Sequence, residues 1–271
     1  MTLDDVNKST RTTALVYGPP KAGKTALVGK LASEFTLHWF DLEAGIKTLL
    51  NPAILDPKYL RNINVLNIPD HRMYPIAIDT MREVFRGGLK TICATHGKNN
   101  CPLCVKSPTA KSTQIDISKL GDNDIIVIDS LSQLAGSALN KATYKEISKP
   151  DGEDYKATFH DYAMQGALMN QVLSLVQVSN LNVIAISHEV DVEKSDTKQK
   201  LVPIAGTRNF SVTVAKFFDA VIYCTVVNKG HRAYSSSTYS PNHVTGSRLP
   251  VDVDTNKDGG ISLLPLFKRG T

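Results

Sequence analysis

The chain has 271 residues, 42% of them hydrophobic and 21% charged, which is the balance of a soluble globular protein with one full hydrophobic core. No apolar run approaches the roughly 20 residues of a membrane helix. The polar first eleven residues also lack an apolar signal segment, so we expect a cytoplasmic protein with no membrane span. Lysine and arginine outnumber acidic residues by 31 to 26, which is compatible with phosphate-rich partners and equally with an ordinary basic surface.

Short β-branched runs alternate with longer helical patterns along the chain, which predicts an α/β protein with a mainly parallel sheet. The predicted strands are residues 13–17, 37–41, 64–68, 125–129, 183–187 and 220–227. The predicted helices are residues 25–35, 76–85 and 159–178. Runs near Ala233 and at 261–267 are also strand-like, so we expect an antiparallel extension at the C-terminal end of the sheet.

Residues 89–115 break this rhythm, because they are rich in lysine, cysteine, asparagine, proline and threonine. We therefore expect a single domain over residues 1–271, with residues 89–115 inserted into it as a small knuckle.

A glycine-rich loop joins the first predicted strand to the first predicted helix. The segment GPPKAGKT, residues 18–25, fits the pattern G-x-x-x-x-G-K-[ST] in the strand–loop–helix context that a phosphate-binding loop requires. Its backbone N–H groups and the helix N-terminus favour phosphate oxygens. The predicted nucleotide-binding residues are Gly18, Pro19, Pro20, Lys21, Ala22, Gly23, Lys24, Thr25 and Ala26. Lys24 should reach the β- and γ-phosphates of ATP, and the Thr25 hydroxyl should ligate Mg²⁺.

Further polar residues lie at or just after the ends of three predicted strands. Asp129 closes the most apolar strand and is the expected second group on the magnesium side. The second strand ends at Asp41 and is followed by Leu42 and Glu43, and Glu43 has the better reach to orient water against a γ-phosphate. The alternative is that Glu43 is a solvated loop carboxylate or a helix-start residue. His188 follows the strand 183–187, where it is either a γ-phosphate sensor or a structural histidine.

The segments GPPKAGKT, FDLEAG, IIVIDSLSQL and VIAISHEV together resemble the RecA/RadA/DnaB group of ATPases. This resemblance implies a RecA-like P-loop core in which a sensor strand, here carrying His188, lies between the strands of Lys24 and Asp129. The chain length is similar to that of phage-encoded Sak-type ATPases, which act in single-strand annealing and recombination in the host cytoplasm. Residues 69–73 hold no glutamate where RecA places its base, whereas Glu43 matches the position used by DnaB-type helicases.

ATPases of this group complete their site with a cation from the next subunit of a ring or filament. Residues 227–232 resemble the Lys-x-Arg element of DnaB helicases with one extra spacing residue, so Lys229 and Arg232 are the candidates for acting in trans in a homo-oligomer. A hairpin turn with solvated charges is an equal alternative.

The resemblance also implies that the loops at 139–156 and 190–210 line a path for single-stranded DNA. Both loops carry lysines and aromatic residues, interleaved with acidic ones. The leading hypothesis is a DNA-stimulated ATPase of recombination or annealing. The alternatives are a regulatory or loader-type ATPase acting on a protein partner, and a small-molecule phosphotransferase.

Three of the four cysteines lie within twelve residues inside the 89–115 segment. Cys93 and His96 form one pair with two intervening residues, and Cys101 and Cys104 form a second pair. Two such pairs can close a tetrahedron around structural Zn²⁺. The alternative is that His96 is a spectator beside three reduced thiols.

Overall fold

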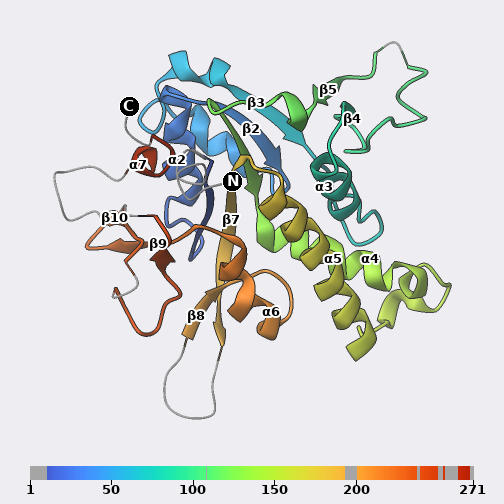
Figure 1. Ribbon diagram of the computed structural model, residues 1–271. Helices are drawn as coiled ribbons and strands as arrows, with labels where there is room; N and C mark the ends of the chain where they lie inside the picture. The colour runs from blue at the N-terminus through green and yellow to red at the C-terminus, as the bar shows by residue number, and fades with distance from the viewer. Residues whose placement is uncertain are drawn as a thin grey trace, which may run out of the picture.

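The computed structural model describes residues 11–107, 109–192, 200–236, 239–249, 253 and 262–268. These residues form a central nine-stranded sheet flanked by helices, and a separate two-stranded sheet, β4 (Lys90–Cys93) with β5 (Ser112–Ile115) (Figure 1). The path through the central sheet runs β10-β9-β1-β7-β6-β2-β3, with β8 paired to β7 and β11 paired to β9.

The middle of the central sheet is parallel. The parallel strands are β1 (Thr13–Gly18), β2 (Thr36–Asp41), β3 (Ile63–Asn67), β6 (Asp124–Asp129), β7 (Asn182–Val192) and β9 (Ala220–Val227). Antiparallel strands flank them: β8 (Lys200–Pro203), β10 (Gly230–Tyr234) and β11 (Gly246–Ser247). The predicted fold class, a mainly parallel α/β sheet with a C-terminal antiparallel extension, is confirmed. Because the carboxyl ends of parallel strands share one edge, the residues that follow β1, β2, β6 and β7 converge there.

Two hydrophobic layers bury the sheet from opposite faces, and strand side chains alternate between them. On β1, Leu15 and Tyr17 belong to one cluster, whereas Ala14 and Val16 belong to the other. The first layer contains three helices, α3 (Ala77–Phe85), α4 (Leu131–Ile147) and α5 (Phe159–Val178), which Figure 1 shows together on one side of the sheet. The second layer contains α2 (Lys24–Gly29), the 3₁₀ helix η1 (Lys30–Ser33) and α7 (Leu264–Phe267).

Shorter elements complete the described chain. These are the helix α6 (Arg208–Thr213) and the 3₁₀ helices η2 (Gly45–Leu50), η3 (Pro57–Asn62), η4 (Ile117–Lys119), η5 (Gly152–Asp154) and η6 (Val214–Phe217). None of the helices described here has the length and apolar content that a membrane span requires.

The structure departs from the sequence prediction in three elements. Helix α4 was not predicted, and its last turns occupy the first half of the expected loop 139–156. The run 261–267 contains the helix α7 instead of a strand, because Pro265 lies in its first turn and cannot donate to a strand ladder. The strand predicted at 183–187 continues to Val192 and turns back through β8, while residues 193–199 of the second expected loop lie outside the described residues.

Candidate nucleotide site

The glycine-rich loop leaves β1 at Gly18 and enters α2 at Lys24, as the motif predicts. Gly18 has φ of +148°, and a Cβ placed on it would lie 2.0 Å from the carbonyl oxygen of Cys224 on the neighbouring β9. Gly23 caps α2 with φ of +87°. Both positions therefore require glycine. The first N–H groups of α2 have no partner within their own helix, so the loop and helix start present donors to an anion.

Lys24 is buried at the base of this loop, with 6% of its surface exposed. Its ammonium donates to the carbonyl oxygens of Gly18 at 2.9 Å and Pro19 at 2.8 Å. Burial lowers the pKa of Lys24, and the nearby carboxylates of Asp129 and Glu43 oppose that shift. An ammonium group held by two loop carbonyls at the base of a phosphate loop is placed to meet the phosphate charge.

The metal side of the cavity is built by the ends of β2 and β6. Asp41 and Asp129 are partners in the register of these strands, and each is 3% exposed. Thr25 Oγ1 donates to Asp129 Oδ2 at 3.3 Å. Burial raises the pKa of Asp129 to about 7, with further contributions from Glu43 and Asp41. Asp129 thus lies beside the Thr25 hydroxyl and close to two other carboxylates. A bound divalent cation would reduce the repulsion between these carboxylates.

Glu43 and His188 approach the same cavity from two different strands. The chain turns after β2 at Ala44, which has φ of +55°, and this turn leaves Glu43 beside Ser130 and His188. The Ser130 hydroxyl donates to Glu43 Oε1, and His188 Nε2 lies 3.2 Å from Glu43 Oε2. His188 is the register partner of Gly18, because β7 lies between β1 and β6. The strand order implied by the resemblance is therefore present.

A cavity of about 360 Å³ joins these groups. Of the residues predicted from sequence, it is lined by Lys21, Gly23, Lys24, Thr25, Ala26, Glu43, Asp129 and His188. The structure thus gathers the loop lysine, a buried aspartate, a second carboxylate and a strand-end histidine around one space. Residues 10–249 of the chain match the family model described as an AAA domain.

The chain belongs to the AAA domain family. It is therefore an ATP-binding P-loop ATPase, and the partly exposed Thr25 hydroxyl beside the buried Asp129 carboxylate fits the magnesium ion that accompanies ATP in such sites.

Two further similarities accompany the family match. A 169-residue stretch is 24% identical to the replication factor C large subunit of Thermofilum pendens; it covers 57% of this chain and 40% of that protein. The chain thus spans less than half the length of this relative. Among solved structures, an ATPase from the type III secretion system of pathogenic bacteria matches with a TM-score of 0.41 and 11% identity, over 80% of this chain and 51% of that one.

The cavity is also lined by residues that were not predicted from the sequence motifs. His231 on β10 lies with Nδ1 3.1 Å from the carbonyl oxygen of Ala22, so the β9–β10 hairpin reaches over the phosphate loop. Gly45, Thr48 and Ile54, from the segment after Glu43, line the cavity as well. His231, Thr48 and Ile54 could not be found from the motifs, because tertiary contacts bring them to the cavity, whereas Gly45 is the last residue of the FDLEAG segment.

Lys229 and Arg232 lie on the same hairpin as His231 but are not among the residues lining the cavity. Lys229 is exposed in the turn with φ of +63°, and Arg232 donates to the carbonyl oxygen of His231. Their role in trans stays a prediction, because the structure is that of a single chain.

The sequence-predicted knuckle residues also come together, at a separate location. The ligand atoms of Cys93, His96, Cys101 and Cys104 all lie within 4.8 Å of one another. The remaining cysteine, Cys224, is buried on β9, as its apolar surroundings in the sequence indicate.

Replacing Asp129 with asparagine is expected to stabilise the nucleotide-free ATPase at alkaline pH. The pKa of Asp129 is raised from 3.8 to about 7, so the folded chain keeps a proton that the unfolded chain releases. The resulting stability is fully present below pH 3.8 and is lost as pH rises to about 7. The shift sets an upper bound of about 4 kcal/mol on this loss.

The melting temperature of the Asp129→Asn variant should therefore exceed that of the wild type by several degrees at pH 8. The difference should shrink at pH 4.5, where the folded wild type already carries a neutral carboxyl group. Scanning calorimetry in a chelator at both pH values measures this, and an equal difference at the two values would contradict it.

Proposed function

We propose that this ATPase is a RecA-like protein that hydrolyses ATP with Mg²⁺, binds single-stranded DNA and acts in recombination or annealing. The observation that carries the proposal is the convergence of Lys24, Asp129, Glu43 and His188 on one cavity, with β7 inserted between β1 and β6. In this proposal Lys24 contacts the β- and γ-phosphates and Thr25 with Asp129 holds Mg²⁺. Glu43 orients the attacking water, and His188 senses the γ-phosphate.

The sensor strand supports a link between ATP and a second ligand. His188 contacts Glu43 in the cavity, and the same strand continues to Val192 and pairs with β8 outside it. Ser132 of α4 accepts from the backbone N–H of His188 at 2.8 Å, so the strand end is also tied to α4. A ligand on the β7–β8 hairpin or on α4 can thus act on the groups that face the γ-phosphate.

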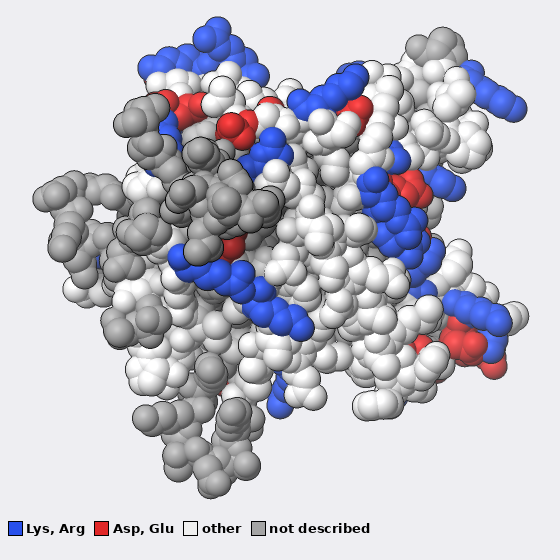
Figure 2. Space-filling view, in the orientation of Figure 1, with Lys and Arg blue, Asp and Glu red and all other residues white. Residues whose placement is uncertain are grey.

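A similarity to a replication protein supports nucleic acid as that ligand, whereas the surface charges are mixed (Figure 2). The relative named above is a replication factor. On the face drawn in Figure 2, lysine and arginine form several separate groups with acidic residues among them, not one continuous basic stripe. Lys141 on α4 pairs with Asp79, and Lys149, two residues beyond the end of α4, pairs with Glu146. Arg208, exposed at the start of α6 beside the β7–β8 hairpin, is the cation we assign to the DNA phosphates.

Single-stranded DNA is expected to stimulate ATP hydrolysis severalfold at low salt, with the stimulation falling as salt rises, because phosphate contacts release counterions. Turnover with and without an oligonucleotide, and with duplex DNA of equal length, measures this. Arg208→Glu should weaken the stimulation, whereas Lys119→Glu should leave it unchanged, since Lys119 is 79% exposed near the opposite, amino-terminal edge of the sheet.

Absence of both binding and stimulation at low salt would refute the DNA proposal. Turnover that responds only to a protein partner would indicate the loader-type ATPase. Phosphate transfer to a small nucleotide would indicate a phosphotransferase.

We further propose that the site is completed in a homo-oligomer. Lys229 and Arg232 lie outside the cavity of their own chain, on an exposed hairpin. In the homo-oligomer, Lys229 and Arg232 contact the γ-phosphate of the ATP bound to the neighbouring subunit.

A further inference from the structure

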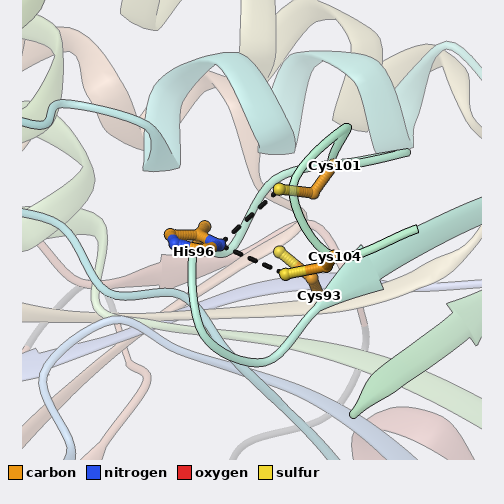
Figure 3. A group of neighbouring side chains, drawn as sticks. All are labelled: Cys93, His96, Cys101 and Cys104. Atoms are coloured by element: carbon orange, nitrogen blue, oxygen red, sulfur yellow. Dashed lines mark hydrogen bonds between the residues drawn. The ribbon is translucent and has the colours of Figure 1, made fainter. Parts of the chain in front are cut away.

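The 89–115 segment carries four soft ligands at the open end of its own two-stranded sheet. Cys93 is the last residue of β4, His96 lies in the turn that follows, and Cys101 and Cys104 come from the next loop. Figure 3 shows His96 facing Cys101 and Cys104, with Cys93 beside Cys104. His96 Nδ1 lies 3.3 Å from Cys104 Sγ and 3.6 Å from Cys101 Sγ.

These separations match a tetrahedral metal site. Bonds of about 2.3 Å from zinc to sulfur and about 2.05 Å to nitrogen, at tetrahedral angles, place a nitrogen and a sulfur ligand roughly 3.6 Å apart. All four ligand atoms lie within 4.8 Å of one another and Nδ1 is the nitrogen turned toward the sulfurs. We infer that Cys93, His96, Cys101 and Cys104 bind one Zn²⁺ and that this ion fixes the knuckle against α3. Four protein ligands leave no open position, so the ion is structural.

The knuckle buries few apolar side chains. Among the described residues of the segment, the buried apolar ones are Ile92, Cys93, Cys101 and Ile115, and two of these are proposed ligands. Leu103 and Val105 are each 72% exposed. Ile92 and Ile115 anchor β4 and β5 to the hydrophobic layer that contains α3, so the part of the segment without such anchoring is the loop region between the two strands. An ion that ties the residues after β4 to the loop before β5 supplies the missing stabilisation.

The loop between the two ligand pairs is the part that docks on the core. The Thr80 hydroxyl of α3 donates to the carbonyl oxygen of Gly97 at 2.7 Å, and the Asn99 amide donates to Glu83 Oε2 at 3.0 Å. Gly97 packs so closely that an added Cβ would lie 2.8 Å from Ile68 Cγ2. Because Gly97 directly follows His96, the ion that orients His96 also orients this contact. The contacts named here involve α3 and the end of β3, not the nucleotide cavity.

Elemental analysis of the full chain, purified with a reducing agent and without chelator, is expected to give one zinc per chain. Exchange with Co²⁺ should give the intense visible absorption of a tetrahedral site with thiolate ligands. Less than about 0.1 zinc per chain together with no such absorption after Co²⁺ addition would overturn the inference. Both measurements use the wild-type protein, so they do not depend on whether a ligand variant folds.

The four cysteines provide a matched pair of variants. Cys104→Ala should retain zinc at least tenfold less well than wild type against a competing chelator. Cys224→Ala removes a thiol far from the cluster and should retain zinc as the wild type does. Equal zinc retention by the Cys104 and Cys224 variants would overturn the assignment of the ligands.

Limited proteolysis tests the proposed stabilising role of the ion. Chelator-treated wild type should be cleaved faster by protease within residues 94–111 while still binding a fluorescent ATP analogue, because the knuckle contacts lie on α3 and not at the phosphate loop. Unchanged cleavage after verified zinc removal would overturn the stabilising role. None of these measurements depends on DNA binding or turnover.

Discussion

Replacement of Lys24 by alanine is expected to lower ATP turnover at least 10²- to 10³-fold, which is the scale of losing one charged group preorganised at the reacting phosphate. The ammonium is buried at the base of the loop and held by the carbonyl oxygens of Gly18 and Pro19. Water admitted in its place cannot supply a fixed positive charge. Turnover at saturating ATP and Mg²⁺, with and without single-stranded DNA, is the measurement.

Lys30→Ala is the matched control for the Lys24 variant. Lys30 follows α2 directly, is exposed, and is not among the residues lining the cavity, so its loss should leave turnover unchanged. Circular dichroism and the melting temperature establish that both variants fold. A folded Lys24→Ala protein that hydrolyses ATP within threefold of the wild-type rate would mean that the loop does not bind the reacting phosphates.

Much of the site could be predicted because its signals are local in the sequence. The phosphate loop is contiguous, and Asp41, Asp129 and His188 each lie at or directly after the end of an apolar run. In a parallel sheet the carboxyl ends of the strands lie at one edge, so these three residues were expected to lie close together. Among the helices, α3 and α5 were predicted with bounds within one residue of those observed, whereas α4 was not predicted.

Helix α4 was not predicted because its hydrophobic periodicity is weak. Its buried face includes small residues, Ala135, Ser137 and Ala138, which pack closely but give weak apolar contrast against the polar residues around them. A start signal was nevertheless present, because Ser130 accepts from the backbone N–H of Gln133 in the pattern S-x-x-Q. His231 could not be predicted at all, since its contact with Ala22 spans 209 positions of the chain.

Glu43→Gln is expected to preserve ATP binding while lowering hydrolysis at least 10²-fold. The Glu43 side chain lines the cavity and lies between Ser130 and His188, so a glutamine of equal shape can keep contacts but cannot accept the proton of an attacking water. Equilibrium binding of an ATP analogue and single-turnover hydrolysis separate the two effects. Glu34→Gln is the matched control, because Glu34 pairs with Lys268 and does not line the cavity.

Asp41 is the rival base, and the structure argues against it. Asp41 is 3% exposed and accepts from the backbone N–H of Gly45 at 3.1 Å, which holds the turn that carries Glu43. Burial raises the pKa of Asp41, while backbone hydrogen bonds oppose that shift. Asp41→Asn should therefore weaken hydrolysis only indirectly. A Glu43→Gln protein with wild-type turnover, beside an inactive but folded Asp41→Asn protein, would reverse the assignment.

The Glu43 variant also tests whether neighbouring chains share the site. If Arg232 acts on the next subunit, Glu43→Gln and Arg232→Ala chains should each be inactive alone. In a mixed oligomer some interfaces then pair an intact Glu43 with an intact Arg232, and turnover should reappear at up to about a quarter of the wild-type rate for random equal mixing. If co-assembled mixtures regain no turnover although each variant is inactive alone, Arg232 acts on the site of its own chain.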